Sequence, residues 1–217
     1  MRTKYSSQVY RADGKSKFIE ILNSAFPIDK VQINAIEYDA DTNKQTKNLP
    51  IYVDVVKMSV LAEEVMNGQF KAKIDEAVKS GKFNGMPVSA YTSYFVDMGG
   101  IDEVKVEKRF DELQKMYPFL QKGMAISRQL KIQKASRDGL AYIVRVEYGP
   151  GKSDSKGLIV PAGNAPVYVN VALSEDAFKE MMMAFKMHYQ AYLNGKYFRF
   201  NSELFPNDSV NIFKSDK

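Results

Sequence analysis

The chain offers few residues that could carry out catalysis. It contains one histidine, His188, and no cysteine. The lack of cysteine excludes disulfides, thiolate nucleophiles and Cys-ligated metal sites. His188 lies in a helix-like run of Met and Phe residues, and no Ser/His/Asp or Cys/His arrangement can be assembled around it. We therefore predict that the protein is not an enzyme and uses no cofactor and no metal.

Two further patterns match active-site motifs only in part. The segment Gly149–Ser153 (GPGKS) contains the residue types of a phosphate-binding loop. It lacks the Gly-x-x-x-x-Gly-Lys-Ser/Thr spacing, and polar loop rather than helix follows it. The acidic pairs at residues 63–64 and 102–103 are typical of a helix surface and of a helix N-terminal turn. Neither pattern supports a catalytic site.

Composition leaves binding functions open. Hydrophobic residues make up 45% and charged residues 26% of the 217 residues, as in ordinary globular proteins, and the net charge is +5. This basic excess permits binding to a polyanion without requiring it. No stretch approaches the roughly 20 apolar residues of a membrane span, and residues 1–11 lack the apolar core of a signal peptide. We expect a cytoplasmic protein without membrane contact.

An internal repeat organises the chain. Four pairs of similar segments occur in the same order: Tyr5–Tyr10 with Tyr91–Val96, Lys17–Ile21 with Arg128–Ile132, Ile36–Tyr38 with Val146–Tyr148, and Pro50–Val55 with Pro166–Val171. The separations within the pairs are 86, 111, 110 and 116 residues. The largest change is explained by an extra segment in the second copy, residues 102–122. Insertions in loops are what a structural repeat tolerates.

The repeated segments predict strands, and helices follow them. Apolar and polar residues alternate in Lys17–Leu22 and in the other matched blocks, as in strands with one buried face. Helix-like runs follow both fourth blocks, at Met58–Asn67 and Glu175–Leu193. Ser174 is a natural N-cap for the second run and Gly195 a stop signal. The Met and aromatic residues of this second helix have the spacing of a core-facing stripe.

We predict an α+β protein of two tandem ββββα repeats related by a pseudo-twofold axis, with antiparallel sheets and helices packed on one side. The first repeat is expected to span residues 1–80 and the second residues 81–200, packed as one unit. An extra charged helix is inserted within residues 102–122 and ends at Pro118. A short helix is predicted at residues 72–80, and residues 201–217 form a polar tail.

This order of elements resembles the Whirly family and the related fold of the transcriptional positive cofactor that binds single strands. The resemblance covers residues 5–193 and rests on element order and duplication. The segment Gly14–Phe18 (GKSKF) loosely matches the lysine- and glycine-rich signature of Whirly proteins. The resemblance implies a sheet surface for single-stranded DNA, with a role in replication, recombination or transfer. Proteins of this fold also occur in phages and mobile elements.

Strand alternation predicts which residues form that surface. The face away from the helices should carry Gln8 and Tyr10, Phe18 and Glu20, Tyr52 and Asp54, and in the second copy Thr92 and Tyr94, Gln129, Lys131 and Gln133, Tyr168 and Asn170. Aromatic rings can stack on bases, and lysine and arginine can neutralise phosphates. Lysines 44, 47, 152 and 156 lie on predicted hairpin loops. The predicted nucleic-acid-binding residues are Tyr10, Arg11, Lys15, Lys17, Phe18, Tyr52, Tyr94, Arg128, Lys131, Lys134, Arg145, Lys152, Lys156 and Tyr168.

Three alternatives stay open at this point. The tyrosines could instead complete the interface between the repeats or a homodimer interface, because tyrosine is common at such surfaces. The protein could be a protein-interaction or regulatory module without a nucleic-acid role. RNA could replace DNA, since the contacts that separate them are individual hydrogen bonds. Further copies of the chain, or replication and recombination proteins, are the expected protein partners.

Overall fold

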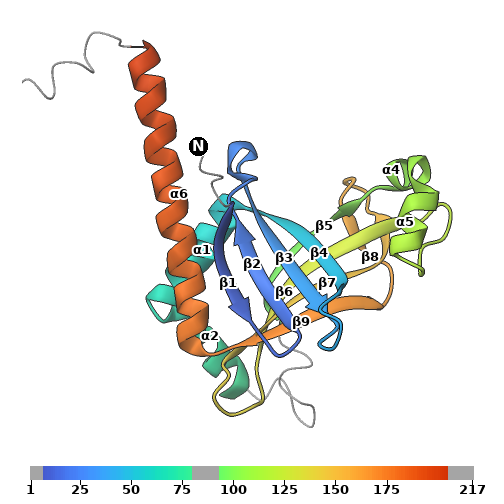
Figure 1. Ribbon diagram of the computed structural model, residues 1–217, viewed down its shortest axis with the longest axis horizontal. Coiled ribbons are helices and arrows are strands. Elements are labelled where there is room, and N and C mark those ends of the chain that lie inside the picture. Colours follow the sequence, from blue (N-terminus) through green and yellow to red (C-terminus); the bar gives the residue numbers. More distant parts are fainter. Residues whose placement is uncertain (1–6, 80–92, 205–217) are drawn as a thin grey trace, which may run out of the picture.

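Two antiparallel sheets cross each other in this computed structural model, which describes residues 7–79 and 93–204, apart from the side chains at 77–78, 93–96 and 199–204 (Figure 1). Sheet A has neighbouring strands β1 (Gln8–Asp13), β2 (Lys17–Leu22), β3 (Lys30–Tyr38) and β4 (Gln45–Asp54). Sheet B contains β5 (Ser93–Ile101), β6 (Ala125–Lys134), β7 (Tyr142–Ser153), β8 (Ile159–Pro161) and β9 (Val167–Leu173). Both β8 and β9 pair with β7, at its two ends. The predicted α+β class with antiparallel sheets is confirmed.

Helices follow the last long strand of each sheet. The strand β4 leads into α1 (Val55–Met66) and α2 (Gln69–Lys79), and β9 leads into α6 (Glu175–Leu204). The Asp54 carboxylate accepts hydrogen bonds from the backbone N–H groups of Val56 and Lys57, and the Ser174 hydroxyl accepts one from Ala177. These caps satisfy amides that the first helical turn leaves unpaired. The predicted N-cap at Ser174 is therefore confirmed.

Other predicted boundaries need correction. The long helix α6 continues past Gly195 to Leu204, and α1 begins three residues before the predicted Met58. The inserted segment forms two short helices rather than one, α4 (Glu103–Lys108) and α5 (Phe110–Met116). A short 3-10 turn, η1 (Phe26–Ile28), joins β2 to β3. Most of the predicted polar tail, residues 205–217, lies outside the described residues.

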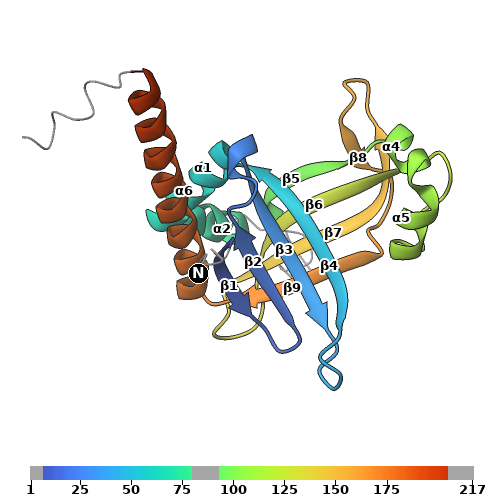
Figure 2. The same cartoon turned by 45° about the horizontal axis from the view of Figure 1, so that its top comes forward.

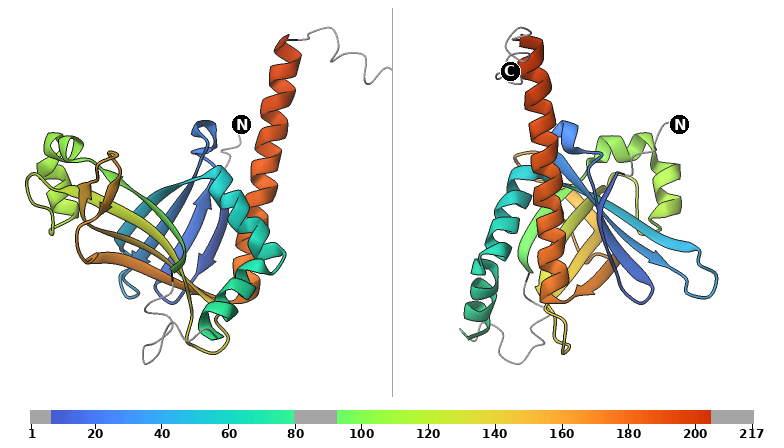
Figure 3. Two further views of the ribbon diagram at one scale, coloured as in Figure 1. Left: turned by 180° about the vertical axis from the view of Figure 1, so that it is seen from behind. Right: turned by 60° about the vertical axis from the view of Figure 1, so that its left-hand side comes forward.

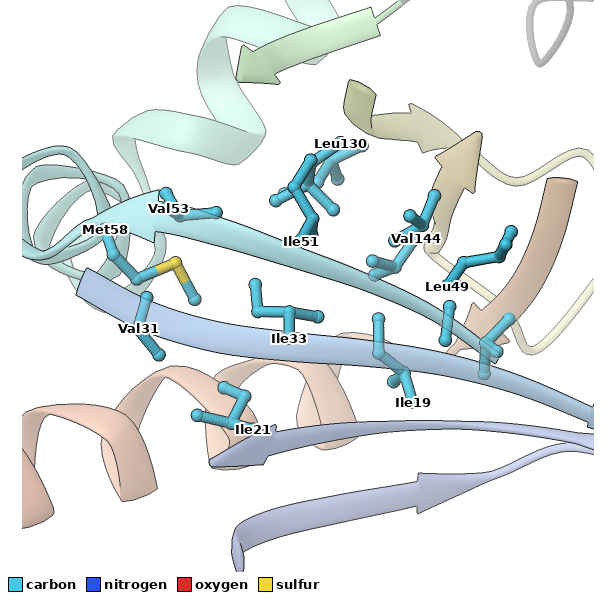
Figure 4. Close-up of a cluster of buried hydrophobic side chains, with 14 of the residues drawn as sticks. Ile19, Ile21, Val31, Ile33, Leu49, Ile51, Val53, Met58, Leu130 and Val144 are labelled. Atoms are coloured by element: carbon cyan, nitrogen blue, oxygen red, sulfur yellow. The ribbon is translucent and has the colours of Figure 1, made fainter. Parts of the chain in front are cut away.

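The inner faces of the two sheets form one core (Figure 4). Ile19, Ile33 and Ile51 of sheet A point toward Leu130 and Val144 of sheet B. Each of these side chains is at most 3% exposed. Full burial of an Ile, Leu or Val side chain contributes roughly 1.5–3 kcal/mol, so this layer fixes how the sheets cross.

The helices α1 and α6 cover one side of this core (Figure 3). Figure 3 shows α1 and α6 side by side against the sheets, with the far part of α6 extending beyond them. The α6 helix is tied to η1 by an aromatic cluster, in which the ring centroids of Phe26 and Tyr189 are 5.3 Å apart. Among the residues that the structure describes, no helix combines the length and apolar character needed to cross a bilayer.

The ladders of the two sheets have matching registers. We call three residues that pair across three neighbouring strands a row. Three inner-face rows of sheet A match three inner-face rows of sheet B in position. The matching rows are Ile21–Ile33–Ile51 with Ile132–Val144–Val171, Ile19–Ala35–Leu49 with Leu130–Val146–Val169, and Lys17–Glu37–Lys47 with Arg128–Tyr148–Val167. The register also shifts at the same place in both first strands, between Gln8 and Tyr10 in β1 and between Ser93 and Phe95 in β5.

This register corrects three of the four sequence matches. The first is displaced by one residue, because Tyr10 pairs with Ile21 as Phe95 pairs with Ile132, whereas the sequence match aligned Tyr10 with Val96. Along the ladders Val146 corresponds to Ala35, whereas the shared Glu-Tyr pair had aligned it with Ile36. A slip of one residue exchanges the two faces of a strand, so the sequence match paired an outward side chain with an inward one. The last match is displaced by four residues, because Ile51 corresponds to Val171 rather than to Val167.

Each sheet extends past the edge strand of the other. The edge strand β9 crosses sheet A and contacts β2 and β3, while β4 crosses sheet B and contacts β6 and β7. Figure 2 shows the β1–β2 and β3–β4 turns projecting beyond β9, and sheet B projecting beyond β4 toward α4 and α5. The row Lys17–Glu37–Lys47 is the last one of sheet A before these turns. This arrangement brings charged residues of sheet A next to β9.

Candidate functional site

Two cations lie against the exposed ring of Tyr168 where the turns of sheet A pass β9. We call this region the open end. It contains cations from both sheets, two carboxylates, one tyrosine and one asparagine: Lys15, Lys17, Lys47, Lys131, Arg137, Arg145, Glu37, Glu147, Tyr168 and Asn170. Four of these six cations contact the two carboxylates. The local charge is clearly positive.

Glu37 is the centre of the sheet A part of the open end. Its carboxylate contacts the Lys17 ammonium at 3.0 Å and the Lys47 ammonium at 2.5 Å, one on each neighbouring strand. Burial would raise the pKa of Glu37, but the hydrogen bonds and charges of Lys47 and Lys17 outweigh burial and lower the pKa. The group thus stays ionised at neutral pH and leaves one positive charge uncompensated.

Glu147 has the same role on the outer face of sheet B. Its buried carboxylate forms ion pairs with both Lys131 and Arg145. The Arg145 guanidinium also donates to the Asn170 side chain at 3.4 Å. A buried carboxylate needs such partners, because removing an unpaired charge from water is costly. One carboxylate again holds two cations in place.

Tyr168 joins these two charge clusters. The Arg145 guanidinium lies 3.9 Å from the centroid of its ring, and the Lys47 ammonium lies 6.0 Å from it. Both distances suit cation–π attraction. The side chain is still 40% exposed. A planar ring fixed by cations and open to solvent is suited to stacking on a flat ligand.

A cleft of about 540 Å³ opens between the β1–β2 turn and the β9 residues Asn170–Ala172. Its walls are the β1–β2 turn from Asp13 to Lys17, the loop residues Arg137 and Leu140, and the β9 segment Asn170–Ala172. Asp13, the remaining carboxylate of this wall, forms an ion pair with Arg11 at 2.5 Å. Lys15, Lys17 and Arg137 therefore give the cleft a positive lining.

The outer face of sheet A is a separate aromatic surface. The Arg11 guanidinium lies 3.6 Å above the ring of Phe18, which is 6.3 Å from the ring of Tyr38. Tyr52, on the same face, is 45% exposed. Arg11, Phe18 and Tyr52 therefore lie on the predicted face. They are on the opposite side of the sheet from Lys17, whose side chain belongs to the inner-face row.

Tyr10 does not lie on the face predicted for it. It pairs with Ile21 on the inner side, and its hydroxyl is 3.2 Å from both the Ala177 carbonyl and the Glu180 carboxylate of α6. Burial, and then the charge of Glu180, raises the pKa of this tyrosine. The register shift in β1 turned the side chain over, and a simple alternation cannot anticipate such a shift.

Four more predicted residues lie apart from the open end. Arg128 is on the inner face of sheet B, and Lys134 forms an ion pair with Asp75 of α2 at 3.7 Å. Lys152 and Lys156 are exposed around the β7–β8 turn, where the neighbouring Ser153 binds Glu103 of α4. The side chain of Tyr94 lies outside the described residues. Of the predicted residues, the open end unites Lys15, Lys17, Lys131, Arg145 and Tyr168.

Sequence reasoning did not identify the two carboxylates or Arg137 as part of the site. It assigned Lys47 to a flexible loop, although β4 begins at Gln45. The sequence does not show that Lys17, Glu37 and Lys47 pair across three strands, because this pairing depends on the register of the strands. Among the described residues no group of three or more His, Cys, Asp or Glu could hold a metal ion, and His188 is exposed on α6.

Comparisons with protein-family models, with curated proteins and with solved structures find no match to this chain.

Proposed function

We propose that the protein binds single-stranded nucleic acid, DNA in the first instance, at the open end and with weak sequence specificity. The observation that carries this proposal is the exposed ring of Tyr168, held between Arg145 and Lys47. A base can stack on any accessible part of this ring, since every base has a π-face. Weak specificity is expected because stacking does not read base edges.

The charge distribution supports a polyanionic ligand. Glu37 and Glu147 each hold two cations, so each cluster keeps one positive charge that no described carboxylate within the cluster compensates. A phosphate that approaches such a cluster releases condensed counterions, and this favours binding at low salt.

We also propose that the two halves are copies of one ββββα unit, arranged as in the Whirly-like fold. The matching rows, the matching register shifts in β1 and β5, and the caps at Asp54 and Ser174 support this proposal. The inner-face rows keep a constant separation of 111 residues between β2 and β6 and between β3 and β7. Two sheets of unrelated origin would not be expected to share the same rows, register shifts and helix caps.

Protein binding is the second candidate function, favoured by one part of α6. Met183, Met187 and Tyr197 of this helix are 47%, 65% and 60% exposed. Figure 1 shows the far part of the helix standing clear of both sheets. Exposed apolar side chains that gather on one element are typical of protein contacts. This surface is distant from the open end, so the two functions can be tested separately.

The deciding experiment is fluorescence anisotropy with a labelled oligothymidine of about 30 nucleotides, long enough to exceed the site of one such domain. Tyr168→Ala should weaken binding by about 5- to 150-fold, corresponding to roughly 1–3 kcal/mol for one stacked base. Tyr197→Ala is the matched control, because it removes an exposed tyrosine far from the open end. Duplex DNA should bind more weakly than the single strand.

Binding should also weaken steeply as salt is added. Equal losses of affinity in Tyr168→Ala and Tyr197→Ala would argue against the open end as the binding site. No binding by the unaltered chain at micromolar concentration and low salt would refute the proposed function and leave protein binding as the better hypothesis.

A further inference from the structure

The open end has a counterpart in sheet B with a different content. The row Lys17–Glu37–Lys47 of sheet A corresponds to the row Arg128–Tyr148–Val167 of sheet B. Both rows lie on the inner face of their sheet, next to the layer of core residues. Both also lie where their sheet passes the edge strand of the other one. We call the sheet B region the closed end.

The inserted helices fill the closed end. Val106, Leu113 and Leu120, from α4, α5 and the turn that follows, are each at most 3% exposed and belong to the same core as Tyr148. The ring of Tyr117 lies 5.4 Å from the ring of Tyr148. Figure 1 shows α4 and α5 at the far end of sheet B, beyond β4. Apolar packing therefore occupies the place that is solvent in the open end.

Arg128 of the closed end is only partly exposed and packs against an aromatic ring. Its guanidinium lies 5.1 Å from the centroid of the Tyr148 ring, and its Nε is buried without a hydrogen-bond partner among the described residues. Tyr148 itself is fully buried, and its hydroxyl donates to the Pro50 carbonyl of β4. Burial strongly raises the pKa of this hydroxyl. The corresponding Lys17 keeps 31% of its side chain exposed.

The open end, in contrast, keeps room for a ligand. Its cleft of about 540 Å³ falls within the roughly 300–1,000 Å³ typical of small-ligand sites. Lys15, Lys17 and Arg137 line the cleft, and the Asn170 side chain adds a polar group. These groups suit a phosphodiester and its sugar better than an apolar segment.

We propose that each chain has a single groove for nucleic acid, because the α4–α5 insertion closes the second of two equivalent grooves. The phosphates of the single strand lie along Lys15, Lys17, Lys47 and Arg137, and the closed end takes no part. This inference rests on the proposed function and adds to it the stoichiometry and the path of the strand.

The test combines stoichiometry with a pair of charge variants. An oligothymidine of about 12 nucleotides, within the range of one single-strand site, is titrated into the full chain well above its Kd. One oligonucleotide per chain is expected. The double variant Lys17→Gln/Lys47→Gln should bind the oligonucleotide at least tenfold more weakly than the unaltered chain. The slope of the logarithm of its binding constant against the logarithm of the salt concentration should become shallower by about 1.4, at about 0.7 for each phosphate that is no longer neutralised.

The matched control is Lys115→Gln/Lys122→Gln, which removes the same charge from exposed positions on the insertion. Its affinity should change less than about twofold, since long-range charge effects are screened beyond about 10 Å at moderate salt. Urea unfolding of both double variants confirms that each is folded. Binding of two oligonucleotides per chain, or equal losses in the two double variants, would overturn the single groove and leave the proposed function intact. No binding by the unaltered chain would overturn both.

Discussion

The open and closed ends show how one backbone arrangement can carry two different chemistries. Corresponding positions hold Glu37, 19% exposed, and Tyr148, which is fully buried. Around Glu37 the neighbours are two lysines, whereas around Tyr148 they are an arginine and the ring of Tyr117. The backbone ladders are the same, so the difference comes from what covers each end.

Packed helices at one end and solvent at the other determine which residue types each end can hold. At the closed end, α4 and α5 exclude water, and an unpaired carboxylate there would cost several kcal/mol. A tyrosine instead contributes a large apolar area and needs only one partner for its hydroxyl, which the Pro50 carbonyl provides. At the open end, water can solvate the charged side chains of Lys17, Glu37 and Lys47. An inserted pair of helices can therefore turn a solvent-exposed end of a sheet into part of the core.

The largest expected effect is in the closed end. Tyr148→Ala should lower the free energy of unfolding by about 3–5 kcal/mol, as for other large aromatic residues truncated in a core. Lys17→Gln, the comparison variant in the open end, should cost less than about 1 kcal/mol because its ion pair is partly exposed. Urea denaturation of both variants measures the difference. Similar costs in the two variants would contradict the view that only one end is core.

The helix caps that follow the two sheets should contribute similarly to stability. Asp54→Ala and Ser174→Ala should each lower the free energy of unfolding by about 1 kcal/mol, with a range of roughly 0.5–2. Each change removes the side-chain acceptor for amides of the first turn of α1 or α6. Thermal unfolding followed by circular dichroism would report both.

Asp54 also contacts the Lys30 ammonium at 3.3 Å, so the cost of its removal should exceed that of Ser174 by a few tenths of a kcal/mol. The variant Lys30→Gln measures this extra part separately. A negligible effect at either cap would weaken the proposed equivalence of the two halves.

Local patterns predicted much of the fold. Alternation in Lys17–Leu22 gave the strand and its buried Ile19 and Ile21, and Ser174 marked the start of α6. These features depend on residues close in sequence, so periodicity and capping are sufficient to find them. The two antiparallel sheets follow from the same signals.

The site itself was predicted only in part, because it depends on register and on how the sheets cross. The register shift that turns Tyr10 toward α6 leaves no trace in the alternation of β1. Likewise, the identical dipeptides Glu37-Tyr38 and Glu147-Tyr148 suggested an alignment that the ladders displace by one residue. The contact of Lys47 with Tyr168 joins strands that are far apart in the chain. Such long-range geometry has no local sequence signal.

The smallest expected effect on stability concerns Glu37 of the open end. Glu37→Gln should lower the free energy of unfolding at pH 7 by less than about 1 kcal/mol, the usual value of partly exposed ion pairs. The lysines lower the folded-state pKa of Glu37, so its stabilisation is fully present above the unfolded-state pKa and is lost as pH falls through the folded-state pKa. The difference between variant and unaltered chain should therefore vanish in acid.

The same substitution should have the opposite effect on binding. Glu37→Gln frees Lys17 and Lys47 from their shared carboxylate and raises the local charge by one, so single-stranded DNA should bind several-fold more tightly at low salt. Salt should reduce this gain, because it screens the added charge. Glu103→Gln, which removes a carboxylate near the closed end, is the control and should leave the affinity nearly unchanged. Weaker binding by Glu37→Gln, with the fold intact, would mean that Glu37 positions the lysines for the ligand rather than competing with it, and that the ion pairs are part of the binding geometry.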